Sequence, residues 1–138
     1  MYFLHFGSPT RFDPSLGSLY HDVENPDVFV CPSDRAESGN SYAINSRLSG
    51  STTNVGFYSG IPQAALSAPS STLLFLEEAA PEDPAGSTND GYFDARHDQL
   101  SRRHRGGANF AFCDGHVQRL KGAAVKYPDP GGDPRFEP

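Results

Sequence analysis

The segment Asn109–Leu120 constrains the fold more than any other part of the chain, because its pattern predicts a β-hairpin. Two runs with extended, alternating character flank the dipeptide Asp114-Gly115. This dipeptide is typical of the two-residue type I′ turn, which needs a positive φ at both central positions. A turn of that type would place Phe112 opposite Val117.

The same register predicts which side of the hairpin is buried. Phe110, Phe112 and Val117 would share one face, and their apolar character makes it the expected core face. Cys113 and His116 would then point to the opposite face.

The remaining pattern predicts an α+β domain, mainly an antiparallel β-sheet of roughly four to six strands with short helices. Continuous apolar character in Thr72–Glu77 favours a central strand that is buried on both faces. Short helical turns are expected within Pro14–Asn25, capped by Ser15 or Ser18, and at Ile61–Leu66, with Pro62 in its first turn. Further extended segments are expected at Val28–Cys31, Ser41–Asn45 and Asp90–Asp94.

Length and composition predict a single small globular domain flanked by two terminal segments. The chain has 138 residues and a net charge of −6, and this charge argues against nucleic acid as a partner. No run of about 18 apolar residues and no signal peptide is found in it. We expect an extended N-terminal segment (1–15), a globular domain (16–122) and a Pro/Gly-rich tail (123–138) that is disordered in isolation.

The order of several short motifs resembles a known family. In chain order these motifs are Gly17–Tyr20, Val28–Asp34, Ser41–Asn45, Ala68–Thr72 followed by Glu77-Glu78, Asp90–Phe93, and His104 with nine residues before Asp114-Gly115. The set is similar to the C-terminal globular region of bacterial prepilin-like proteins that carry an H-x9-DG motif and resemble type II secretion pseudopilins. The resemblance covers about residues 16–120.

This resemblance implies a structural protein and no enzyme. The chain would be an exported subunit that self-associates into an extracellular pilin-like filament or a secretion pseudopilus, at the cell surface or in the periplasm. Members of this family begin with a cleaved leader and a long apolar helix, which this sequence does not show. We therefore expect either a processed or truncated piece or assembly by another route, with membrane contact only through a helix of that kind.

The family motif itself is expected to have structural roles. His104 would bond to backbone carbonyls and fix the approach to the hairpin. Gly106 and Gly107 would allow close backbone approach. Asp114 and Gly115 would form the turn. A metal-binding or catalytic role for His104 is the alternative.

The cysteines of the chain, Cys31 and Cys113, have several interpretations. In an exported protein they are expected to form a disulfide, which would close a loop of about 80 residues and add roughly 4 kcal/mol of stability. The alternatives are two buried free thiols, or pairing of Cys31 with a residue of a longer precursor.

Metal binding is considered for two sets of residues. Pilin-like secretion subunits often hold calcium in an acidic loop, and this resemblance makes calcium the candidate cofactor. Its oxygen ligands would come from Asp90, Asp94, Glu77 and Glu78, with Asp34 as a further acid. The alternative is that these acids are simply solvated.

Zinc is the second candidate metal. His104, Cys113, Asp114 and His116 offer suitable ligand types, although their spacing matches no compact zinc motif.

Other functions are weighed against the filament subunit. A secreted module that binds carbohydrate or a cell-surface partner would use Phe57, Tyr58 and Tyr92, and a zinc-dependent enzyme is a third class. The loop at Ser51–Thr53 is a candidate for O-linked glycans. A basic patch of Arg102, Arg103 and Arg105 is either a solvated loop or a surface that docks on the acidic loop of a neighbouring subunit.

Overall fold

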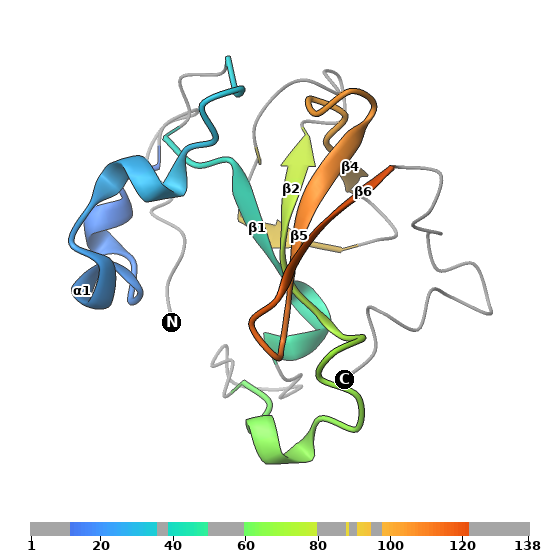
Figure 1. Cartoon of the computed structure of the whole chain (residues 1–138). Coiled ribbons are helices and arrows are strands. Elements are labelled where there is room, and N and C mark those ends of the chain that lie inside the picture. Colours follow the sequence, from blue (N-terminus) through green and yellow to red (C-terminus); the bar gives the residue numbers. More distant parts are fainter. Residues whose placement is uncertain are drawn as a thin grey trace.

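The computed structural model describes residues 12–35, 39–49, 60–79, 88, 91–94 and 98–121. These residues form a small α+β domain, mostly a β-sheet with a few short helices (Figure 1). The predicted fold class is confirmed at this level. Most of the segment 1–15 and the whole tail 123–138 lie outside the described residues.

Eleven elements follow one another along the described chain. The helices are η1 (Pro14–Leu16), α1 (Tyr20–Val23), η2 (Pro26–Phe29), η3 (Ser46–Ser49) and η4 (Gln63–Ala65), and all except α1 are 3₁₀ helices. The strands are β1 (Tyr42–Asn45), β2 (Leu73–Ala79), β3 (Tyr92–Phe93), β4 (Gln99–Leu100), β5 (Gly107–Phe112) and β6 (Val117–Lys121). Among the described residues, no helix combines the length and the apolar character that crossing a bilayer requires.

The strands form one mainly antiparallel sheet. Their order is β3-β1-β2-β5-β6, and β4 pairs with the C-terminal end of β2. Only the pairing of β1 with β3 is parallel among the described strands. β2 lies between β1 and β5, which confirms the central position predicted for the strand at Thr72–Glu77. Its predicted burial on both faces is not complete, because Leu74 and Phe75 are only half-buried. The strand continues to Ala79, so Glu77 and Glu78 belong to it and are buried.

The described residues before β1 include three short helices, η1, α1 and η2, which lie at one side of the sheet (Figure 1). Helical turns near residues 15–23 were predicted correctly, but Asp13 rather than a serine caps η1, by accepting the Ser15 N–H at 3.0 Å. The prediction of a strand at Val28–Cys31 was wrong. Asn25 accepts the Asp27 N–H at 3.0 Å and a proline follows it, so the sequence starts a 3₁₀ helix here instead.

The hairpin forms, but its turn differs from the predicted one. Among the turn residues only Gly115 has a positive φ, of 92°. The Gly115 N–H donates to the Phe112 carbonyl at 2.9 Å, and the Phe112 N–H donates to the His116 carbonyl at 2.9 Å. This is a three-residue loop, in which a tight turn is followed by a glycine in the left-handed conformation.

The extra loop residue shifts the register by one position. Val117 pairs with Ala111 instead of Phe112, and its side chain is 68% exposed. His116 comes to lie opposite Phe112, and the two rings stack with centroids 4.2 Å apart. The predicted places of Val117 in the core and of His116 on the other face were therefore wrong, because a one-residue slip reverses every side chain of a strand.

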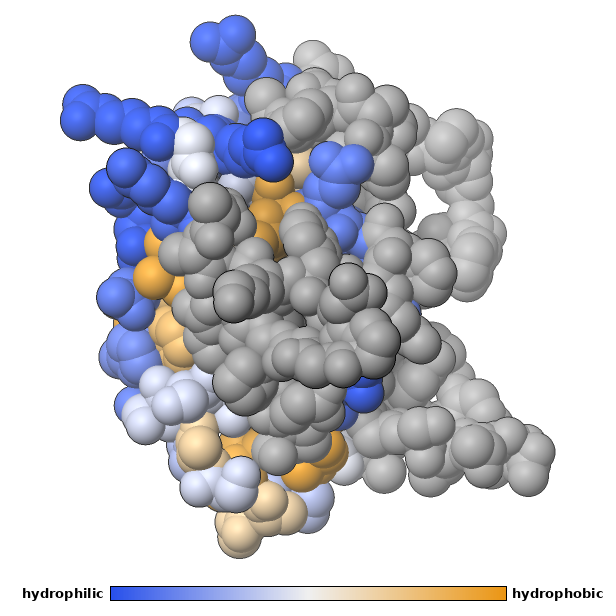
Figure 2. Space-filling model, turned by 90° about the vertical axis from the view of Figure 1, so that its right-hand side faces the viewer, coloured by the Kyte–Doolittle hydropathy of each residue, from blue (hydrophilic) through white to orange (hydrophobic). Residues whose placement is uncertain are grey.

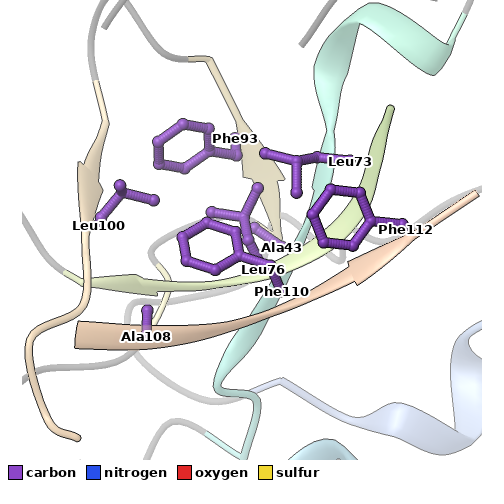
Figure 3. Close-up of a cluster of buried hydrophobic side chains, with 8 residues drawn as sticks. All are labelled: Ala43, Leu73, Leu76, Phe93, Leu100, Ala108, Phe110 and Phe112. Atoms are coloured by element: carbon purple, nitrogen blue, oxygen red, sulfur yellow. The ribbon is translucent and has the colours of Figure 1, made fainter. Parts of the chain in front are cut away.

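The hydrophobic core covers one face of the sheet, as Figure 3 shows. Phe110 and Phe112 lie in it as predicted, with exposed fractions of 0% and 3%. The other members come from β1, β2, β3, β4 and β5: Ala43, Leu73, Leu76, Phe93, Leu100 and Ala108. The labelled side chains of β3 and β4, Phe93 and Leu100, point toward those of β2 and β5 and enclose this face (Figure 3).

The register shift predicts unequal effects of two truncations in the hairpin. Phe110→Ala removes a fully buried ring and should lower the free energy of unfolding by about 3–5 kcal/mol. Val117→Ala removes exposed methyl groups and should change it by less than about 0.5 kcal/mol. Urea unfolding of both variants measures this difference. If Val117→Ala cost as much stability as Phe110→Ala, Val117 would be in the core, and the two-residue turn would be the correct description.

Candidate functional site

The sheet face opposite the core carries a buried carboxylate at its centre. Glu77 of β2 is 0% exposed and pairs with Tyr42 of β1. On its other side lies Asn109 of β5, whose backbone N–H donates to Glu77 Oε2 at 2.7 Å and whose Nδ2 donates to Oε1 at 3.3 Å. Burial of a carboxylate without such donors would cost several kcal/mol, about 3 or more, so these bonds are needed for the fold.

His104 reaches the same carboxylate from the loop before β5. Its Nε2 lies 2.8 Å from Glu77 Oε1, and its side chain is 23% exposed. The imidazole thus contacts an acid, whereas the motif predicted bonds to backbone carbonyls. The main chain of His104 does fix the approach to the hairpin, because its N–H donates to the Gly107 carbonyl and its carbonyl accepts the Gly107 N–H, both at 3.1 Å.

Each of the two glycines of the motif is required for a different steric reason. Gly106 has a φ of 79°, which residues other than glycine rarely adopt. At Gly107 a Cβ atom would lie 2.4 Å from the Leu120 carbonyl oxygen, so the strands β5 and β6 could not approach as they do. The prediction of close backbone approach therefore holds at Gly107.

Cys31 completes the site from a third part of the chain. It follows η2, is 3% exposed, and its backbone N–H donates to Ser41 Oγ at 2.9 Å. Its Sγ lies 3.4 Å from His104 Nε2. The ligand atoms of Cys31, Glu77 and His104 all lie within 4.8 Å of one another. We call these residues the Cys31–Glu77–His104 cluster.

This arrangement differs from a nucleophilic triad. In a triad the nucleophile contacts one imidazole nitrogen and the acid contacts the other. Here the thiol of Cys31 and the carboxylate of Glu77 both face Nε2 of His104. The ring cannot use this nitrogen to accept a proton from the thiol while the same nitrogen donates to the acid. The geometry therefore suits three side chains that bind one shared ion better than a proton relay between them.

A buried ion pair lies beside the cluster. Arg103 Nη1 is 2.5 Å from Asp34 Oδ2, and the two side chains are 2% and 0% exposed. Arg103 also donates to Ser101 Oγ at 2.6 Å and to the Glu78 carbonyl at 2.7 Å. Only Arg102 and Arg105 of the predicted basic patch are exposed, so Arg103 takes no part in a surface for an acidic partner.

Within the described part of the chain, the predicted calcium ligands do not come together. Glu77 and Glu78 are successive residues of β2, so their side chains point to opposite faces. Glu78 Oε2 accepts the Thr88 hydroxyl at 2.5 Å, in a separate buried place. Asp94 directly follows β3 and is half-buried, and Asp90 lies outside the described residues.

The predicted disulfide is absent, because Cys31 and Cys113 are free and lie apart. Cys31 contacts His104, just before β5, while Cys113 comes directly after that strand. Six strand residues span about 20 Å, and a disulfide needs Cα atoms within about 7 Å.

The predicted zinc ligands likewise lie at opposite ends of β5. His104 lies at one end of β5, and Asp114 and His116 pair with each other at the other end, with 2.6 Å between Oδ1 and Nδ1. Bonds from His116 lower the pKa of Asp114. Burial, together with the nearby Asp114 carboxylate, raises the pKa of the Cys113 thiol.

No family model matches the chain, and no curated protein or solved structure matches it.

The aromatic residues proposed for ligand binding are largely outside the described region. Phe57 and Tyr58 lie outside it, as does the glycan candidate Ser51–Thr53. Tyr92 is half-buried on β3.

The sequence carried one overlooked signal for the site. Glu77 ends a continuous apolar run, and an acid within a buried strand must have partners. Its partner His104 is 27 residues after it and the nearby Cys31 is 46 residues before it, and no motif connects these positions.

The thiols provide a direct test of this description. Alkylation in denaturant without reductant should modify both Cys31 and Cys113, whereas in the folded protein only Cys113 should react. The raised pKa of Cys113 lowers its thiolate fraction at neutral pH, so this reaction should be slower than that of an ordinary exposed thiol.

Asp114→Asn removes the nearby negative charge and should therefore speed alkylation of Cys113, as followed by mass spectrometry. Asp22→Asn, an exposed change in α1, is the control and should have no effect. Resistance of both thiols to alkylation in denaturant would contradict the free-thiol structure.

The buried ion pair predicts a second contrast, between neighbouring arginines. Arg103→Met leaves the buried Asp34 carboxylate without its guanidinium and should lower the free energy of unfolding by about 3–5 kcal/mol. Arg102→Met is the matched control, and its exposed side chain should matter by less than about 0.5 kcal/mol. Thermal or urea unfolding measures both, and equal effects would show that Arg103 is a surface residue.

Proposed function

We propose that this chain is a structural subunit of an extracellular pilin-like filament or of a type II secretion pseudopilus. The proposal joins the order of the sequence motifs to one structural observation, an apolar row on the face of the sheet opposite the core. In this row the aligned residues of five neighbouring strands share one face. They are Tyr92, Ile44, Phe75, Ala111 and Val117.

The apolar row is only partly covered. Val117 is 68% exposed, and the other four residues are half-buried. With strands about 4.8 Å apart, the row extends about 19 Å across the sheet. An apolar strip of this extent on a second sheet face favours contact with another element, because water otherwise contacts it directly. An apolar helix, of the type on which pilin-like subunits assemble, has the chemistry to cover it.

The N-terminal helices add further apolar surface. Leu16, Val23 and Val28, on or next to η1, α1 and η2, are 65%, 39% and 56% exposed. This segment lies at one side of the sheet (Figure 1). Figure 2 shows another face of the molecule, on which hydrophobic residues reach the surface between hydrophilic ones. Such surfaces fit a protein that packs against copies of itself better than one that acts alone.

The proposal predicts that assembly depends on one side of β6. Val117→Asp places a charge on the apolar row and should abolish or strongly reduce fibres of the native protein in electron micrographs. Gln118→Asp is the matched control, because Gln118 is also exposed but points to the other face of the same strand. Circular dichroism should show that both variants remain folded.

Equal assembly of the two variants would remove the apolar row from the proposal. A native protein that forms no regular fibres would contradict the proposal as a whole, and a secreted binding module would then be the better explanation.

A further inference from the structure

We propose that Cys31, Glu77 and His104 form a binding site for a zinc-class divalent metal ion. The three ligand atoms come from three segments far apart in the sequence and lie within 4.8 Å of one another. None of the metal sets considered from the sequence contains this combination. The inference stands independently of the filament proposal, since it depends only on the interior of one subunit.

The first argument is the competition for a single nitrogen. Cys31 Sγ and Glu77 Oε1 lie 3.4 Å and 2.8 Å from the same atom, Nε2 of His104. This nitrogen holds either one proton or one lone pair. A proton on it can be shared only unequally between the two acceptors, whereas a metal ion at the centre binds all three atoms at once.

The second argument is the match of distances. Tetrahedral zinc with bonds of about 2.3 Å to sulfur and about 2.05 Å to nitrogen holds these two atoms about 3.5 Å apart. The observed separation of Cys31 Sγ and His104 Nε2 is 3.4 Å. Nitrogen and oxygen ligands would lie about 3.4 Å apart, so Glu77 Oε1 would move by about 0.6 Å from its present contact. A small side-chain rotation supplies such a shift.

The third argument is the support behind the ligands. Asn109 donates to both oxygens of the Glu77 carboxylate, at 2.7 and 3.3 Å. The Cys31 main chain is held by Ser41, whose hydroxyl in turn donates to Asp34 at 2.6 Å. Bonds of this kind orient ligating groups in known metal sites.

Burial and ligand type narrow the choice of metal. The Cys31 and Glu77 side chains are buried, and His104, with a side chain that is 23% exposed, is the ligand in contact with solvent. A thiolate with an imidazole favours zinc over calcium or magnesium, which prefer oxygen ligands. On binding, the Cys31 thiol releases its proton to the solvent and His104 binds through the Nε2 lone pair.

The test uses the full chain, stripped of metal with a chelator and then titrated with Zn²⁺ or Co²⁺. We expect one equivalent of metal per chain and a higher melting temperature with zinc. Bound Co²⁺ should show a thiolate charge-transfer band. In Cys113→Ser the only remaining thiol is Cys31, so the band should persist with unchanged affinity.

Two further variants locate the site. Cys31→Ser should lose the charge-transfer band and weaken binding by about 100-fold or more, and Asn109→Ala should weaken it by about 10–100-fold. If Cys31→Ser does not fold, the band in Cys113→Ser still decides the question. Failure of Cys113→Ser to bind one equivalent of metal, or a cobalt complex without the thiolate band, would overturn the proposal.

Discussion

The buried carboxylate of Glu77 is the constraint on which the rest of this structure depends. It lies on the central strand with no exposure to solvent. An isolated charge in that position would oppose folding by several kcal/mol, about 3 or more, so the chain must bring donors to it. Asn109 comes from the neighbouring strand, and His104 from the loop that precedes it. The satisfaction of one polar group thereby fixes the approach to the hairpin and brings Cys31, Glu77 and His104 together on the sheet face opposite the core.

Much of this fold follows from local chemistry. The apolar run at Thr72–Leu76 has no amphipathic period, and it becomes the central strand with neighbours on both sides. The alternation around Phe110 and Phe112 correctly places these rings in the core. The glycine of the Asp-Gly pair also marks the hairpin loop, since a left-handed residue is needed in either turn type.

Three features escaped prediction for physical reasons. Both turn types use the same dipeptide, and the choice between them depends on how β6 packs, which the sequence does not display. The Cys31–Glu77–His104 cluster depends on tertiary contacts between residues up to 73 positions apart. A capped 3₁₀ helix at Pro26–Phe29 also overrode the strand propensity of Val28–Val30, because Asn25 offered its N–H groups a local partner.

The side chains around Cys31 also determine how a mechanical load would pass through the domain. Residues 12–31 precede β1, and along the covalent chain a pull on them would arrive at that strand first. The contacts of Cys31 with His104 and of Asp34 with Arg103 provide a second connection, directly to the segment before β5 and, through Glu77, to the central strand. Tension on the N-terminal helices is thus shared between β1 and the central strand β2, which are paired in the sheet. Shearing these strands apart requires several ladder hydrogen bonds to break together.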